Sequence, residues 1–193
     1  MGRVALDHQG LFRLSGHKDK VDQLKLNIDQ GREFQWDAYS IDVIASTHKL
    51  YLRSLPEPLC TNVLYPRFIT AASMTNTAMQ LEYLSCLVHT LPSTHLDLLR
   101  FLLEFSQKVV AHSERNMMHA QNLSIIFGPL FFPTASDDAA TYMAHAGLIS
   151  ALTEVLIVQF QTIFSVRHGW IWVCEGDADG GDGIRVPHLP CIL

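Results

Sequence analysis

The segment from Gly10 to Gly16 (GLFRLSG) holds the residue types best suited to chemistry in this sequence. Glycine at either end allows backbone angles closed to other residues, while Leu11 and Phe12 can anchor the segment in a core. The guanidinium of Arg13 is planar, stays charged at any working pH and meets phosphate oxygens in pairs. We interpret the segment as a short loop, held at its root, that carries Arg13 outward. Taken alone, a surface arginine in a turn is the commoner explanation.

Apolar residues recur at helical spacing through most of the chain, without the alternation typical of strands and without an internal repeat. The helices predicted from this spacing cover residues 17–30, 40–52, 63–72, 78–89, 94–112, 116–127 and 137–164. Ser40 is expected to cap the second helix, and Gly128-Pro129 to end the sixth. Residues 33–39 form a predicted loop whose two aromatic side chains enter the core. The fold class is therefore all-α, a single bundle of about seven helices with short links.

The last 29 residues differ in character from the rest. Glycine and aspartate make up all but one residue from Asp177 to Gly183, two prolines follow, and no helical period is present. The aspartates lack the spacing and the closing glutamate of a calcium loop, so no calcium site is predicted. We expect a helical domain over residues 1–164 and a disordered or poorly packed tail over residues 165–193.

Composition and charge restrict the classes of function. Hydrophobic residues make up 48% of the chain and charged residues 17%, which is typical of a globular domain. The net charge of −5 argues against broad binding to nucleic acid or to an anionic membrane. The most apolar stretch, residues 148–164, is interrupted by polar residues that include Thr153, Glu154, Gln159 and Gln161, and it predicts a buried helix, not a membrane span. Four cysteines without a CxxC pair, and the absence of a leader, predict a soluble cytoplasmic protein.

Other chemistries find little support in the sequence. The ten histidines form no HExxH motif, and no nucleophile and base lie at a spacing that indicates a catalytic pair. No glycine-rich phosphate loop is present either. The sequence therefore predicts no metal site, no cofactor and no nucleotide bound by this chain itself.

Four segments together change the interpretation of the Arg13 loop. They are Gly10–Gly16, then KLYLRSLPEPL over residues 49–59, then Asn116 with Met118, and NLSIIFGP over residues 122–129. In order and spacing they resemble the Rho-family GTPase-activating (RhoGAP) domain, over about residues 6–164. The pattern K-x-x-x-R-x-L-P-E-P-L is long, and its coincidence with the other three segments makes the resemblance specific.

The resemblance implies a role for each site residue. In that family the loop arginine, here Arg13, enters the active site of a bound small GTPase and stabilises charge on the transferred γ-phosphoryl. Lys49 and Arg53, four residues apart on one helix face, would face the GTPase and hold the loop. Asn122 would bond in the interface and help to position the arginine, and Pro129, which closes the same motif, would belong to the same GTPase-binding set. Taken singly, these residues would instead be a solvated stripe, a backbone partner and a helix stop.

The resemblance implies that the partner is a Rho-type GTPase in its GTP-bound state, with magnesium held in the partner's pocket. The chain would be a GTPase activator that lends an arginine and is not itself an enzyme. Only residues 1–9 precede the loop, where family members usually carry further helices, so we regard the domain as N-terminally truncated. Met117 and Leu130 replace residue types common in the family. The alternatives are therefore a GTPase-binding module with little activating ability, and a helical scaffold.

Overall fold

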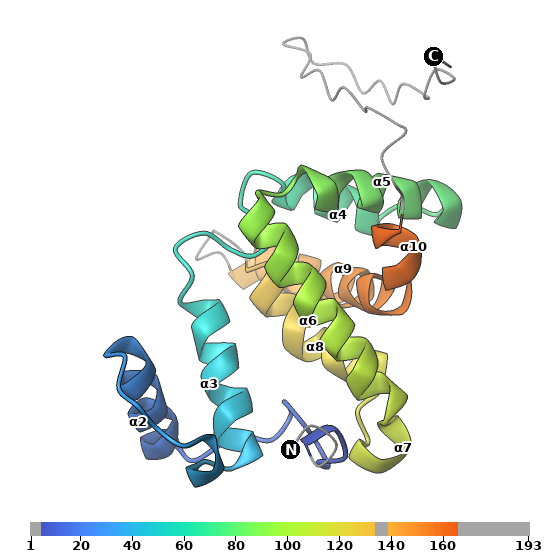
Figure 1. Ribbon diagram of the computed structural model, residues 1–193. Helices are drawn as coiled ribbons and strands as arrows, with labels where there is room; N and C mark the ends of the chain where they lie inside the picture. Colours follow the sequence, from blue (N-terminus) through green and yellow to red (C-terminus); the bar gives the residue numbers. More distant parts are fainter. Residues whose placement is uncertain (1–4, 134–138, 166–193) are drawn as a thin grey trace, which may run out of the picture.

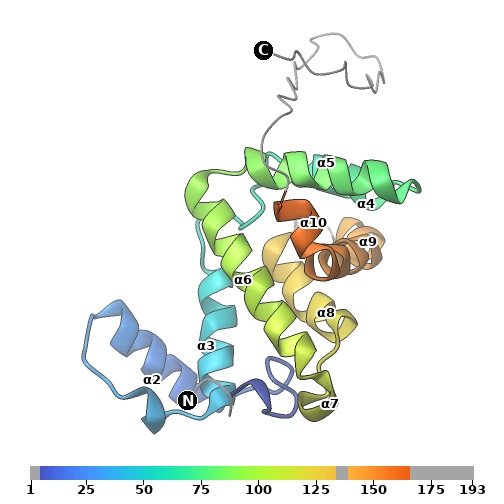
Figure 2. The same ribbon diagram turned by 45° about the vertical axis from the view of Figure 1, so that its right-hand side comes forward.

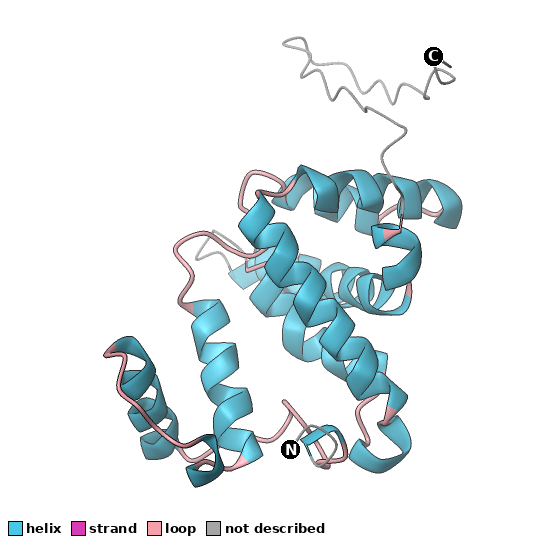
Figure 3. Cartoon of the chain, viewed as in Figure 1, coloured by secondary structure: helices cyan, strands magenta, loops and turns pink. Residues whose placement is uncertain are grey.

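The computed structural model describes residues 5–133 and 139–165, and within these ranges every regular element is a helix (Figures 1 and 3). The α-helices are α2 (Lys18–Asp29), α3 (Ile41–Arg53), α4 (Tyr65–Ala72), α5 (Thr77–Thr90), α6 (Ser93–Ala111), α7 (Ser113–Asn116), α8 (Ala120–Phe131), α9 (Ala139–Val158) and α10 (Phe160–Phe164). A short 3-10 turn lies at Trp36–Ala38. The predicted all-α class is confirmed. None of the described helices is long and apolar enough to cross a membrane.

The helices form a main bundle with a smaller pair at one side. In the bundle, α8 packs along α9, α4 and α5 lie side by side, and α6 crosses in front of α8 in the view of Figure 1. The pair consists of α2 and α3, which Figure 2 shows standing beside the bundle. Val21, Leu24 and Val43 form a small core between them, separate from the main core. Helix α3 also packs against α8, so it links the pair to the bundle.

Local signals account for most helix boundaries. Ser40 caps α3 as predicted, because its Oγ accepts the Val43 N–H at 3.4 Å. The predicted helix over residues 137–164 appears as α9 and α10, separated at Gln159, and its expected start at Asp137 lies outside the described residues. The same holds for nearly all of the predicted tail. Of the aromatic side chains in the 33–39 loop, Phe34 and Tyr39 pack on the small core, whereas Trp36 is 53% exposed and does not enter it.

The prediction that Gly128-Pro129 ends a helix is wrong. Helix α8 continues to Phe131 with Pro129 inside it. Proline forfeits one backbone hydrogen bond there, but Leu130 and Phe131 behind it are fully buried, and this burial outweighs the loss. Gly128 allows a close approach instead: a Cβ at this position would lie 3.0 Å from Ile149 Cγ2 on α9. The helix also begins four residues later than predicted.

Candidate functional site

The Arg13 loop, residues 10–16, has a buried root and an exposed tip. The side chains of Leu11 and Phe12 are only 3% and 6% exposed, whereas Arg13 and Leu14 are exposed. The backbone N–H groups of Arg13 and Leu14 both donate to the Gly10 carbonyl, at 2.8 and 3.0 Å. This tight turn needs a positive φ at Gly10, where φ is 73°.

Phe12 directs Arg13 outward at the expense of backbone strain. Its φ is 67°, a left-handed conformation that costs a side chain about 1–3 kcal/mol. Edge contacts with Phe127 and Phe105, at centroid distances of 4.9 and 5.9 Å, hold the ring in the main core. Because the Phe12 side chain points inward here, the next residue, Arg13, is placed on the surface. A strained residue directly before an exposed arginine is typical of a functional loop.

Lys49 fastens the loop from α3. Its ammonium donates to the carbonyl of Phe12 at 2.5 Å. Partial burial lowers the pKa of Lys49, the positive charge of Arg53 lowers it further, and the carboxylate of Asp42 opposes both. Arg53, one turn later, is exposed, and within the described residues its side chain makes no hydrogen bond to the loop. The two cations therefore share a helix face but occupy different environments.

Asn122 and Pro129 lie on α8, whose Phe127 ring contacts Phe12. Asn122 is half-buried, and among the described residues no hydrogen bond joins it to the loop. It begins a helical stripe at spacings of three, four and seven residues that continues through Ile125 and Ile126 to Pro129. Ile125 in this stripe is 62% exposed. The stripe presents polar and apolar groups on the part of the α8 surface that is not fully buried.

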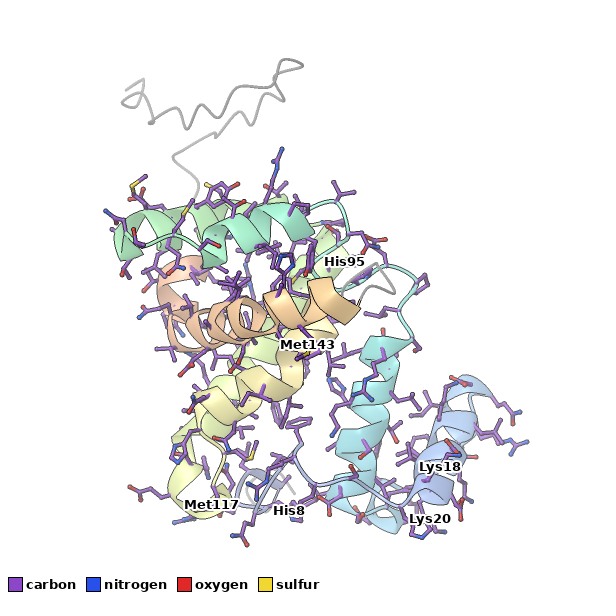
Figure 4. The ribbon with its side chains drawn as sticks, turned by 180° about the vertical axis from the view of Figure 1, so that it is seen from behind. His8, Lys18, Lys20, His95, Met117 and Met143 are labelled. Atoms are coloured by element: carbon purple, nitrogen blue, oxygen red, sulfur yellow. The ribbon has the colours of Figure 1, made fainter. Side chains whose placement is uncertain are left out.

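Asn116 is the structural residue of the site to which our sequence interpretation gave no role. It is fully buried, and its Nδ2 donates to the carbonyls of Leu6 and Val109 at 2.8 Å each. Its Oδ1 accepts the Met118 N–H at 2.7 Å, and its carbonyl accepts the Gly10 N–H at 2.8 Å. Asn116 therefore ties the Arg13 loop to the ends of α6 and α7 through its backbone carbonyl, while its side chain holds the Leu6 carbonyl before the loop. Figure 4 shows His8 and Met117, which flank this junction, at the same end of the molecule.

Gly16 closes the loop against α3 without room for a side chain. A Cβ at this position would lie 2.5 Å from Val43 Cα and 2.7 Å from Val43 N. The Gly16 N–H donates to Ser46 Oγ at 2.9 Å.

We expect Gly16→Ala to force the loop away from α3 and to lower the free energy of unfolding by about 1–3 kcal/mol. Urea denaturation measures this change. Gly31→Ala is the matched control, because nothing lies within 4 Å of its Cβ position and only the strain of its φ of 60° applies. A Gly16→Ala protein as stable as the wild type would show that the loop adapts freely.

The exposed charges of the site include two arginines, Arg13 and Arg53. No group of three or more histidine, cysteine, aspartate or glutamate side chains in the described part of the chain could hold a metal ion. What the site offers is an exposed guanidinium on an anchored loop, a second exposed arginine on α3, and the Asn122 stripe on α8.

Comparison with known proteins decides the family. The sequence model of the RhoGAP domain family matches residues 2–136 of this chain. The chain belongs to the RhoGAP family. Two similar solved structures are RhoGAP-type domains: human Rho GTPase activating protein 15 (TM-score 0.78, 26% identity, 84% of this chain and 78% of that chain) and the BH domain of GRAF, the GTPase regulator associated with focal adhesion kinase (TM-score 0.74, 28% identity, 83% and 86%).

Curated relatives of this RhoGAP chain include N-chimaerin from Bos taurus, 33% identical over 163 residues, which are 82% of this chain and 49% of that protein. The GTPase-activating protein pac-1 from Caenorhabditis elegans is 32% identical over 195 residues, covering 95% of this chain and 11% of that protein. The chain thus spans about half the length of bovine N-chimaerin and about a tenth of pac-1. The family predicted from the four sequence segments is confirmed.

Proposed function

We propose that this chain accelerates GTP hydrolysis by a GTP-loaded Rho-type small GTPase, to which it supplies Arg13 in trans. The observation that carries the proposal is the Arg13 loop itself, with an exposed guanidinium above a root held by buried Leu11 and Phe12 and by Lys49. The proposal places the chain in the cytoplasm, the compartment that its cysteine spacing predicts.

The chemistry follows from the charge that develops on a transferred phosphoryl group. Magnesium and the nucleotide stay with the partner, so the activator contributes positioned positive charge and excludes water. An arginine that enters a GTPase site in this manner accelerates hydrolysis by about 10³–10⁵. That factor corresponds to about 4–7 kcal/mol of barrier. An anchored loop suits this task because its geometry needs little reorganisation when charge develops.

The remaining site residues receive distinct roles in this proposal. Lys49 holds the backbone of the loop, as its bond to the Phe12 carbonyl suggests. Arg53 meets acidic groups of the GTPase. Asn122 and Pro129 supply the α8 side of the interface, and Asn122 has the half-buried amide needed to bond across it.

The direct test is single-turnover hydrolysis of GTP bound to several purified Rho-type GTPases, with and without this chain in excess. Acceleration of at least one GTPase is expected. The alternative of a binding module is supported if the chain binds the GTP-loaded form, measured by titration with a non-hydrolysable analogue, yet leaves the rate unchanged. The cleft beside the loop root, described below, is the observation that favours this alternative. If the chain neither binds nor accelerates any Rho-type GTPase, both the activator proposal and the binding-module alternative are refuted.

We expect Lys49→Ala and Arg53→Ala to differ. The double variant should weaken binding by up to about 2 kcal/mol and make the remaining affinity less sensitive to salt. Lys49→Ala should in addition lower the rate at saturation, because the Phe12 carbonyl loses its donor. Titrations at two salt concentrations and saturated rates separate these effects. Lys18→Ala is the control, since this exposed lysine lies on α2 (Figure 4); equal losses in control and double variant would indicate only a loss of total charge.

A further inference from the structure

Two adjacent residues lead into the Arg13 loop and reach in different directions. Asp7 Oδ1 lies 2.6 Å from His112 Nδ1, and Asp7 Oδ2 lies 2.9 Å from Arg115 Nη1. His8 Nε2 lies 2.8 Å from Asp42 Oδ1. Asp7 thus binds the corner between α6 and α7, whereas His8 binds the first turn of α3. We call the five residues of these contacts the root bracket: Asp7, His8, Asp42, His112 and Arg115.

Both halves of the root bracket are charge-assisted hydrogen bonds of defined direction. A carboxylate can only accept, so the proton must lie on Nδ1 of His112 and on Nε2 of His8. The hydrogen bond from His112, followed by that from Arg115, holds the pKa of Asp7 below its ordinary value. Asp7 therefore remains a charged acceptor at neutral pH, and such bonds are stronger than neutral ones.

The bracket spans a gap in the apolar packing. A cleft of about 230 Å³ lies between α3 and α6, beside the loop root. Its walls include Leu11, Phe12, Ile44, His48, Phe101 and Phe105. Side chains facing a cleft lack dispersion partners on that side, so apolar contacts alone fix the root less firmly than a filled core would. The hydrogen bonds of Asp7 and His8, on either side of the cleft, then fix the position of the loop.

We propose that Asp7 and His8 are positioning residues for Arg13, which fasten the loop root between α3 and the α6–α7 corner. This inference rests on the proposed function of Arg13. Lys49 holds the loop root from α3 at the Phe12 carbonyl, and Asn116 holds Gly10 from the α6–α7 corner. Asp7 and His8 act one step earlier in the chain, where the segment enters the loop. A small displacement there is carried to the guanidinium, and misplacement by about 1 Å can cost about 10²-fold in rate.

The test compares Asp7→Ala, His8→Ala and the double variant in single-turnover hydrolysis over a range of activator concentrations. The maximal rate should fall by about 10- to 100-fold in the double variant. The half-saturating concentration should change by less than about threefold, because neither side chain is assigned to the interface. If Asp7→Ala does not fold, His8→Ala alone carries the same test. Asp19→Ala is the matched control, since its contact with His17 at 3.9 Å is exposed and lies outside the loop root; its rate should equal that of the wild type.

Repeating the substitutions in an Arg13→Ala background distinguishes positioning from a general structural role. If Asp7 and His8 act through Arg13, they should produce no further loss of rate there. A further loss of the same size as in the wild type would overturn the inference, as would a double variant with full maximal rate. The proposed function fails separately, if Arg13→Ala itself retains full acceleration.

Discussion

Arg13→Ala should remove most of the acceleration of GTP hydrolysis, by about 10³-fold or more, while affinity for the GTP-loaded partner changes only a few-fold. The reason is that the guanidinium acts on charge present mainly in the transition state, so ground-state binding depends little on it. Arg13 is exposed and directly follows the strained Phe12, so the substitution leaves the fold intact. Single-turnover rates at saturation and equilibrium titration with a non-hydrolysable analogue measure the two quantities.

Arg13→Lys extends this prediction. Lysine keeps the charge but presents a point charge in place of the planar fork, so the saturated rate should be nearly as low as for Arg13→Ala. The exposed Arg32, in the connection after α2, provides a matched control, because Arg32→Ala removes the same side chain away from the loop. Full acceleration by Arg13→Ala would contradict the assignment of the arginine. A purely electrostatic role would instead give a Lys variant close to the wild type.

The two asparagines near the loop should respond in opposite ways. Asn116→Ala leaves the part-buried carbonyl of Leu6 and the buried N–H of Met118 without this partner, and leaves the Val109 carbonyl with only the His112 N–H. Each such group costs about 1–3 kcal/mol, so a loss of about 3 kcal/mol or more in unfolding free energy is expected. Asn122→Ala, on the half-buried stripe, should cost less than about 1 kcal/mol and weaken binding to the GTPase.

Urea denaturation and thermal melting of the two variants provide the comparison, with affinity measured on whatever remains folded at the assay temperature. A loss of about 3 kcal/mol corresponds to a fall of about 6–12 °C in Tm for a domain of this size. Equal unfolding free energies for Asn116→Ala and Asn122→Ala would mean that water or a shift of the backbone supplies new hydrogen bonds to the former partners of Asn116. A large loss of stability for Asn122→Ala would instead make it a structural residue.

The sequence by itself determined the helical class, most helix boundaries and the anchored form of the Arg13 loop. These features depend on local patterns: apolar spacing for α6, a capping hydroxyl for Ser40, and glycines around an apolar pair for the loop. The family followed from motif spacing, which is also a property of the chain alone.

Tertiary structure decided what these residues contact. Asp7 and His112 are 105 positions apart, and Lys49 meets the Phe12 carbonyl across 37, so no local pattern could indicate either pair. The same reason explains why α8 continues through Pro129. A proline predicts a helix end from its missing N–H, whereas the burial of the residues that follow it depends on α9. Local chemistry specified the arginine and its loop; packing between distant segments decided how firmly that loop is held.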